Sequence, residues 1–284
     1  DRVVMTDQEH PGGRAAYDLR RKRDGIQIFE VALGPLRNDP TRMVAAFRDA
    51  VTPDTKVLAL PQVSSALGLC LPVQKIVAAA RQRAPDVFVV VDGAQALGQI
   101  PVDVANLDCD AYFASAHKWL LGPKGTGVLF VGKRRERQVW TTIASRVWDF
   151  ADDIGRRFTH VGTGNQSLHR GLDAALDFLE RIGLPAIHAR IKTLGDRLRA
   201  GLQKIDGVTI LGSTHAELSA GITAFAVRGF RSEDAVRHLL TRDRILTRVV
   251  TGGIRQSLHV YNGLADVDRT LARVTAMASG RDAR

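Results

Sequence analysis

Short apolar runs alternate with amphipathic stretches through the first half of the chain, and residues 87–91, VFVVV, contain no polar position. Strands that are buried on both faces show continuous hydrophobicity, so these runs indicate a mostly parallel sheet with helices on both sides. That arrangement is the α/β class. The predicted strands are residues 25–31, 56–60, 87–91, 110–114 and 126–131, and the predicted helices between them are residues 41–50 and 72–83.

The pattern changes in the second half, where two long helical patterns precede short strands and single helices. This order suggests a smaller α+β domain. We place the boundary near residues 158–165, so that residues 1–160 form a large domain. Residues 161–284 then form a linking helix, which starts at Ser167, and a small C-terminal domain. The predicted helices are residues 167–182, 184–205, 232–241 and 265–278, and the predicted strands are residues 208–211, 221–227, 245–249 and 254–258.

The first residues, DRVVMTDQEHPGG, resemble the middle of a domain, because the apolar VVM predicts a short strand that runs into a polar loop. No basic region leads into an apolar stretch, so the segment is not a signal peptide. We therefore expect that a natural N-terminal segment is missing. No run of about 18 apolar residues occurs, so we expect no membrane partner.

Composition and charge narrow the function further. The two cysteines, Cys70 and Cys109, lie in apolar contexts and are too few for a disulfide framework, which suits buried side chains in a cytoplasmic protein. The net charge is +10, but the basic clusters at residues 20–23 and 133–137 are not interleaved with aromatics. A solvated face, or attraction for an anionic cofactor and substrate, explains the excess better than nucleic acid does.

Polar side chains gather where two predicted strands end. Asp92 follows a buried strand, and Gln95 comes three residues later. Ser115, His117 and Lys118 follow the next strand, before the glycine-rich GPKGTG. Ligands of open α/β sheets bind outside the carboxyl ends of the strands, so we expect these five side chains to face one crevice.

This set of groups suits an aldehyde cofactor with a pyridine ring. A lysine amine forms a Schiff base with an aldehyde, and burial or a neighbouring cation lowers its pKa for that role. A carboxylate opposite a pyridine nitrogen keeps it protonated, and serine and histidine hydrogen-bond phosphate. Taken singly, each residue has a plainer interpretation: Asp92 as a turn or cap residue, His117 as a structural residue and Lys118 as a surface residue.

The segments D-G-A-Q, then S-A-H-K-W about twenty residues later, then G-P-K-G-T-G, closely resemble the class V aminotransferase family of fold-type I, pyridoxal 5'-phosphate (PLP)-dependent enzymes. Cysteine desulfurases, selenocysteine lyases and isopenicillin N epimerase-like proteins belong to it. The resemblance extends from the Glu9-His10 pair to the Tyr261-Asn262 pair. It implies a mostly parallel sheet of the seven-stranded type with flanking helices, and a small C-terminal α+β domain.

The resemblance also implies roles for single residues. Lys118 is expected to be the Schiff-base lysine and the proton carrier at the substrate α-carbon. The expected cofactor contacts are Asp92 at the pyridine nitrogen, Gln95 at the phenolic oxygen, His10 stacked on the ring, and Ser115 and His117 at the phosphate. Gly162 and Thr163 resemble a loop that reaches the phosphate of a neighbouring subunit, which implies a homodimer with shared active sites. Arg255 resembles the arginine that binds the substrate α-carboxylate.

Three departures from the family pattern limit the function. Ser65 stands where an asparagine commonly contacts the cofactor, and the family's N-terminal phosphate-binding segment is absent. The stretch before Arg255, ILTRVVTGGIRQS, also lacks the mobile-loop cysteine of desulfurases. We therefore expect an epimerase-like enzyme, or a lyase that cleaves C–S or C–Se bonds without a cysteine, acting on a small amino acid. The alternatives are a persulfide-forming desulfurase or selenocysteine lyase, and a catalytically incomplete sulfur-relay protein on the same fold.

Overall fold

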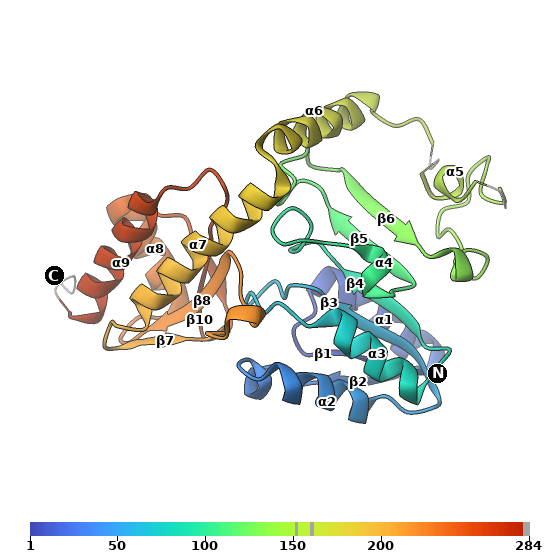
Figure 1. The fold of residues 1–284 in the computed structure, drawn as a ribbon, viewed down its shortest axis with the longest axis horizontal. Coiled ribbons are helices and arrows are strands. Elements are labelled where there is room, and N and C mark those ends of the chain that lie inside the picture. The colour runs from blue at the N-terminus through green and yellow to red at the C-terminus, as the bar shows by residue number, and fades with distance from the viewer. Residues whose placement is uncertain (151–152, 160–161, 281–284) are drawn as a thin grey trace.

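The computed structural model describes residues 1–150, 153–159 and 162–280. These residues form two separate sheets, each with its own helices, joined by two long helices (Figure 1). The joining helices are α6, Gln166–Ile182, and α7, Leu184–Leu202. The predicted boundary between residues 160 and 161 falls outside the described residues, so the division into domains stays a proposal that the two sheets support.

The larger sheet has the strand order β2-β1-β3-β4-β5-β6. Its first five strands are parallel, and β6 pairs antiparallel with β5. The sheet is thus mostly parallel, as predicted, with six strands in the described part of the chain where the family type has seven. The strands are β1 Arg2–Thr6, β2 Gln27–Val31, β3 Thr55–Pro61, β4 Phe88–Asp92, β5 Ala111–Ser115 and β6 Gly127–Val131.

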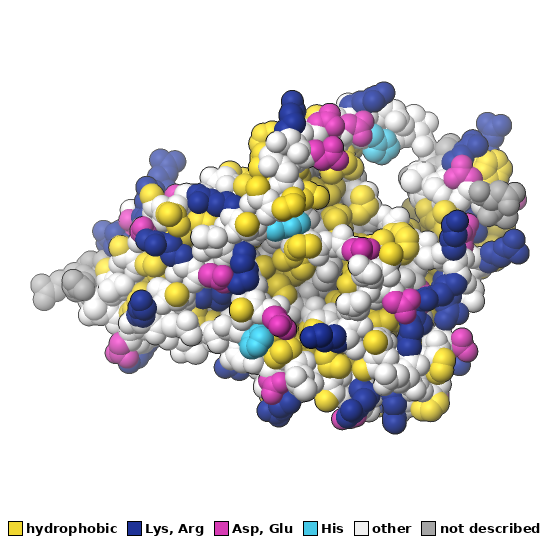
Figure 2. Space-filling model, in the orientation of Figure 1, with side chains coloured by type: hydrophobic (Ala, Val, Ile, Leu, Met, Phe, Trp, Pro, Cys, Tyr) yellow, Lys and Arg dark blue, Asp and Glu magenta, His cyan; other side chains and the backbone are white. Residues whose placement is uncertain are grey.

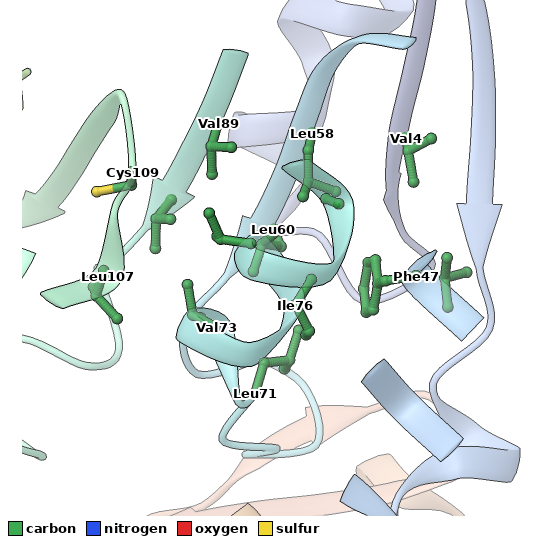
Figure 3. Packing of buried hydrophobic residues seen from close by; sticks show 14 of the residues in the cluster. Val4, Phe47, Leu58, Leu60, Leu71, Val73, Ile76, Val89, Leu107 and Cys109 are labelled. Atoms are coloured by element: carbon green, nitrogen blue, oxygen red, sulfur yellow. The ribbon is translucent and has the colours of Figure 1, made fainter. Parts of the chain in front are cut away.

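Helices cover both faces of this sheet because the central strands are apolar on both sides. Helices α2, Pro40–Ala50, and α3, Val73–Arg83, lie in front of the sheet in Figure 1, and α1, Pro11–Asp24, lies behind it. Phe47 and Ile76 pack against Leu58 and Leu60 on the front face (Figure 3). On the back face Tyr17 of α1 packs against a smaller cluster that includes Val3 and Met5 of β1.

The smaller sheet is antiparallel throughout, with the order β7-β8-β10-β9. Leu198 of α7 and Val274 of α9 pack against Phe225 in its own hydrophobic core. The remaining α-helices and strands are α4 Val104–Leu107, α5 Ile154–Thr159, β7 Val208–Ile210, β8 Ile222–Val227, α8 Ser232–Asp243, β9 Arg248–Val250, β10 Gly253–Ser257 and α9 Leu264–Ala278. Among the described residues, no helix combines the length and the apolar character needed to cross a membrane.

The periodic elements agree with the predicted ones to within a few residues, but one prediction was wrong. The stretch after β1 was expected to be a polar loop, and it forms α1. This helix begins at Pro11, a residue that suits the first helical turn, and it buries no residue completely. It therefore lacks the apolar repeat by which helices are recognised in a sequence.

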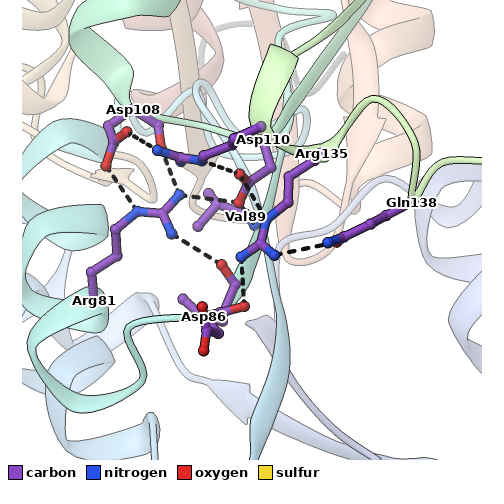
Figure 4. A network of polar contacts seen from close by, with 9 residues as sticks. Arg81, Asp86, Val89, Asp108, Asp110, Arg135 and Gln138 are labelled. Atoms are coloured by element: carbon purple, nitrogen blue, oxygen red, sulfur yellow. Dashed lines mark hydrogen bonds and ion pairs between the residues drawn. The ribbon is translucent and has the colours of Figure 1, made fainter.

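A buried carboxylate joins β5 to the surrounding chain. Asp110 is fully buried, accepts a hydrogen bond from the Val89 backbone N–H (2.8 Å), and pairs with Arg81, Arg134 and Arg135 (Figure 4). Burial alone would raise the pKa of Asp110, but the Val89 hydrogen bond and the neighbouring guanidinium groups hold that pKa below its usual value. The network fixes the start of β5, whose other end carries Ser115.

Replacing Asp110→Ala should lower the free energy of unfolding by about 3 kcal/mol, because the change leaves three guanidinium groups around an empty position. The contribution of the carboxylate is present above the ordinary carboxyl pKa and is lost as pH falls through the lowered value. Urea unfolding at several pH values measures both effects. Asp49→Ala removes an exposed carboxylate paired with Arg48 and should cost less than about 0.5 kcal/mol. Equal losses in the two variants would contradict the role of the network.

Candidate active site

A cavity of about 460 Å³ lies at the carboxyl ends of β4 and β5, beneath the N-terminus of α1. Asp92 is the last residue of β4, and Ser115 is the last residue of β5. Parallel pairing brings these two strand ends to the same edge of the sheet. The cavity is lined by Glu9, His10, Gly12, Gly13, Ala16, Tyr17, Ala59, Leu60, Val90, Asp92, Ala94, Phe113, Ser115 and Lys118.

The turn after β4 fixes the position of Asp92. One carboxylate oxygen accepts a hydrogen bond from the Ala94 backbone N–H (2.8 Å), so the side chain has one oxygen held by the turn. Gly93 allows this turn because a Cβ there would lie 2.0 Å from the Tyr112 ring. Only glycine fits directly after Asp92, because any side chain there would overlap the Tyr112 ring.

A second carboxyl group, Glu9, faces the same cavity. Its Oε1 accepts hydrogen bonds from the Thr6 hydroxyl (2.7 Å) and the Thr6 backbone N–H (3.3 Å). Burial raises the pKa of Glu9 to about 7, and the nearby Asp92 carboxylate adds to that increase. Glu9 therefore exchanges its proton near neutral pH, and no sequence pattern indicates this behaviour.

His10 is the N-cap residue of α1. Its Nδ1 accepts a hydrogen bond from the Gly12 backbone N–H (3.1 Å), which leaves Nε2 as the nitrogen that carries the proton in the neutral ring. The ring lies between the first cavity and a second cavity of about 550 Å³. This position allows an aromatic contact with a molecule bound beside Asp92.

Lys118 lines the first and second cavities and also a third of about 360 Å³. Its side chain is half-buried. Burial lowers the pKa of Lys118, and the guanidinium groups of Arg255 and Arg248 lower it further, while Asp92 opposes the change. These surroundings favour the free amine, which is the form that attacks a carbonyl carbon.

The second cavity contains two arginines on adjacent strands. Arg248 of β9 and Arg255 of β10 are directly opposite each other in the antiparallel pairing. Like charges in this position repel, and burial together with Arg248 lowers the pKa of Arg255. Arg255 donates a hydrogen bond through Nη1 to the Ser65 backbone oxygen. Within the described part of the chain, Arg248 has no ion-pair partner, so the pair is suited to an anion.

The third cavity has an aromatic wall. The Trp119 and His259 rings stack with centroids 5.3 Å apart, and Tyr261 stacks on the other side of His259 at 4.7 Å. Gln95 and His117 line the same cavity. In the described ranges, no three His, Cys, Asp or Glu side chains converge in a way that could hold a metal ion.

Most of the predicted site residues come together around Lys118. Asp92, His10 and Ser115 line the first cavity, and Gln95, Ser65 and Arg255 line the second. His117 does not share a cavity with Ser115, since it lines the third. Gly162 and Thr163 are exposed and line none of the three.

The sequence assigned no role to Glu9 and Trp119, and it placed Arg248 only within residues 248–251, a stretch expected to lie near the substrate pocket. Trp119 follows Lys118 directly in the sequence. A large aromatic residue beside the lysine was the available signal that this side chain packs near the site. Arg248 precedes Arg255 by seven residues, and the intervening VVTGGI is the signal of a hairpin that sets the two side by side.

The family model for aminotransferase class-V matches residues 1–270. The chain belongs to the class-V aminotransferase family. It is 29% identical over 97% of its length to an isopenicillin N epimerase from Streptomyces clavuligerus, of which it covers 73%. It is 30% identical over 96% of its length to a cysteine desulfurase from Serratia proteamaculans, of which it covers 70%.

Solved structures of this family have the same fold. A cystine C–S lyase in complex with its reaction product, cysteine persulfide, has a TM-score of 0.86 at 26% identity; 98% of this chain and 75% of that chain are covered. The apo cysteine desulfurase from Thermococcus onnurineus has a TM-score of 0.85 at 25% identity, with 99% and 73% covered. A lysine variant of the lyase, with a TM-score of 0.86 at 26% identity over 98% of this chain and 74% of that one, carries glycine covalently linked to its PLP cofactor.

The first cavity suits the cofactor of class-V aminotransferases. It offers an amine, a carboxylate on a fixed turn, and an imidazole, and its volume exceeds that of a single pyridine ring. A class-V enzyme also needs a cation for the substrate carboxylate. Arg255 lines the second cavity and has a buried Nε without a hydrogen-bond partner in the described part of the chain.

Replacing Arg248→Ala should raise the pKa of Lys118, because one of the two nearby positive charges is removed. A smaller fraction of Lys118 is then free amine at mildly alkaline pH, and its reaction with an amine-reactive reagent should slow a few-fold. Peptide mapping of the cofactor-free protein across a pH series measures this rate. Arg242→Ala, on the exposed side of α8, is the matched control and should leave the rate unchanged. The same rate in all three proteins would show that Arg248 does not act on Lys118.

Proposed function

We propose that this class-V aminotransferase-family protein binds PLP at Lys118 and acts at the α-carbon of a small amino acid without a cysteine nucleophile. The observation that carries the proposal is the position of Lys118, which lies between a cavity containing Asp92 and a cavity containing Arg255. When bound, PLP supplies an electron sink for the negative charge that develops at the α-carbon.

Each residue of the proposed site has one task. Arg255 binds the substrate α-carboxylate, with Arg248 adding a second positive charge opposite it. With PLP bound, Asp92 would keep the pyridine nitrogen protonated, and Ser115, which lines the same cavity as Asp92, would bind the phosphate. His117 lines a different cavity, so its contact with the phosphate rests on the family pattern alone. Lys118 removes the α-proton and can return it, since its lowered pKa favours the free amine. Return on the opposite face gives epimerisation, and loss of a β-substituent gives C–S or C–Se cleavage.

The cysteines support a route without a persulfide. Both Cys70 and Cys109 are buried, and neither lines a cavity that contains Lys118. Burial raises the pKa of Cys70 to about 12 and that of Cys109 to about 11, so neither is a thiolate near neutral pH. The persulfide-forming desulfurase is the second candidate, which the identity to the Serratia enzyme favours.

Borohydride reduction of the PLP-loaded protein followed by peptide mapping should place the label on Lys118. Lys118→Ala should lose both the label and turnover, because a positioned proton-transfer group contributes about 10²–10⁴-fold to a rate. Lys124→Ala, in the glycine-rich turn, is the matched control and should keep the label on Lys118. Label on another lysine would contradict the assignment.

Incubation of the PLP-loaded protein with a panel of L-amino acids and thiol-substituted alanines distinguishes epimerisation from C–S cleavage. Sulfide, pyruvate and D-enantiomer are measured in parallel. A Cys70→Ser, Cys109→Ser double variant should keep the full rate if no persulfide forms. A loss of sulfide release in that variant, with a persulfide found on either cysteine of the unmodified protein, would instead support the desulfurase.

We also propose that two copies form a homodimer in which Gly162 and Thr163 reach the phosphate of the partner. This loop is exposed and lies away from the cavities of its own chain. Apolar side chains lie uncovered on the neighbouring β6 and α6, and Figure 2 shows hydrophobic side chains gathered beneath α6. We call this set the outer apolar surface: Val128, Leu129, Phe130, Leu176, Phe178 and Ile182.

Sedimentation should give a dimer for the unmodified protein and a monomer for a Leu129→Asp, Phe178→Asp variant, because two charges would be buried at the contact. The monomer should also bind PLP more weakly, since Thr163 would have no partner site. Leu240→Asp introduces the same charge on the exposed side of α8 and should stay dimeric. A dimeric double variant would place the contact elsewhere.

We expect the protein to act in the cytoplasm, in keeping with its buried free thiols.

A further inference from the structure

The side chain that follows Lys118 holds an amide of the active site. The Trp119 indole Nε1–H donates a hydrogen bond to the Gln95 side-chain oxygen at 2.9 Å. An indole nitrogen is a donor only, so the atom it contacts must be the oxygen of the amide and not the nitrogen. The orientation of the Gln95 amide is therefore fixed by chemistry, although a side-chain amide by itself has two nearly equal orientations.

Trp119 is held tightly enough to impose that orientation. The residue as a whole is 4% exposed. It fits between two glycines: a Cβ at Gly98 would lie 2.7 Å from the Trp119 carbonyl oxygen, and a Cβ at Gly221 would lie 3.2 Å from the indole ring. Gly98 also has a φ of +91°, a backbone conformation that disfavours other residues.

A histidine of the small sheet's domain fixes the same tryptophan from the other side. His259 Nδ1 accepts a hydrogen bond from the Val260 backbone N–H (2.8 Å), so the proton of the neutral ring is on Nε2. Nε2 then donates to the Trp119 carbonyl oxygen (3.1 Å), and the two rings stack. His259 therefore holds both the Trp119 backbone, through the hydrogen bond, and the Trp119 indole, through the ring contact.

The backbone of Gln95 is also held. Its carbonyl oxygen accepts a hydrogen bond from the Gln99 side-chain nitrogen, and the Gln99 side-chain oxygen accepts one from the Gly221 backbone N–H (2.8 Å). Gln95 lines both cavities that contain Arg255 and Lys118. Within the described part of the chain, no protein group accepts a hydrogen bond from the Gln95 amide nitrogen.

We propose that Trp119 is a positioning residue. Its indole binds the Gln95 side-chain oxygen and so turns the Gln95 –NH₂ group toward the second and third cavities, as a hydrogen-bond donor beside Lys118. The proposal rests on the proposed function in one respect: the acceptor for this donor is the phenolic oxygen of the cofactor. It goes beyond that function because it makes Trp119 responsible for the orientation of the Gln95 amide. The contact between Gln95 and the cofactor depends on that orientation.

The bond itself can be tested without the cofactor. The chain has three tryptophans, and Trp140 and Trp148 are exposed. In ¹⁵N-labelled protein the Trp119 indole N–H should exchange with solvent much more slowly than the other two. Gln95→Leu should remove this protection, and Gln95→Glu should keep it, since the carboxylate still offers an oxygen. Equally fast exchange of all three indoles in the unmodified protein would overturn the proposal.

The consequence is tested in the PLP-loaded protein by titrating its visible absorbance with pH. A donor to the phenolic oxygen stabilises its negative form, which lowers the pH at which the lysine–cofactor linkage loses its proton. Gln95→Leu should raise that pH by about one unit, as expected for the loss of a charge-assisted hydrogen bond. Trp119→Phe, which keeps the aromatic ring, should shift it in the same direction. The double variant should shift it no further than Gln95→Leu alone, because one interaction is lost in all three.

Trp140→Phe is the matched control, and its titration should match that of the unmodified protein. A shift in Gln95→Leu with none in Trp119→Phe would overturn the positioning role while the proposed function stands. No shift in either variant would overturn the Gln95 contact and the positioning role together.

If borohydride failed to label Lys118, the proposed function would fail, whereas the exchange measurement would still report on the Trp119 bond. If Trp119→Phe does not fold, the exchange rates in Gln95→Leu and Gln95→Glu decide the matter.

Discussion

Burial of the central strands on both faces is the constraint on which the site depends. Residues Val89 and Val91 of β4 pack against α3 and α4, and Val90 faces the cavity behind the sheet. Polar groups are costly within such strands, so they collect where the strands end. Asp92 pairs with Phe113, two residues before β5 ends at Ser115, and Lys118 follows three residues after β5. The positions of the amine and the carboxylate are thus consequences of how the sheet is buried.

The sequence predicts what depends on periodicity and on strand ends, and it fails where neither applies. Continuous apolar runs identified β3, β4 and β5, and the residues after them identified Asp92, Gln95, Ser115 and Lys118. Helix α1 has no apolar repeat, because its inner side lines a cavity and meets the small back-face cluster through Tyr17. The helix that caps the site was therefore missed, together with the cap formed by His10. The VVTGGI segment indicates a hairpin between β9 and β10, but the register that places Arg248 opposite Arg255 depends on the geometry of the turn, which the linear pattern does not give.

Charge is arranged so that the site is incomplete without anions. Besides burial, Arg255 and Arg248 lower the pKa of Lys118, and Arg248 lowers the pKa of Arg255; the acids that line the first cavity are Asp92 and Glu9. Glu9, with a pKa of about 7, is partly protonated near neutral pH and so contributes less than a full negative charge. A phosphate and a carboxylate would relieve the repulsion among the three cations. The overall net charge of +10 has the same sign as this local excess and favours the approach of such ligands.

The small sheet and the segments next to it contact the loops of the large sheet close to Lys118. Arg255 bonds to the Ser65 carbonyl, His259 to the Trp119 carbonyl, and the Gly221 N–H to Gln99. Each of these partners lies in a loop at the carboxyl edge of the large sheet or next to one that does. Arg255 uses Nη1 for the Ser65 carbonyl and keeps a buried Nε without a partner in the described part of the chain, so one guanidinium group joins the two sheets and still offers a donor to an anion. His259 and Gly221 follow and precede Arg255 along the chain, and their contacts hold Trp119 and Gln99. The part of the chain that carries the cation therefore also positions the groups that hold Gln95 beside Lys118.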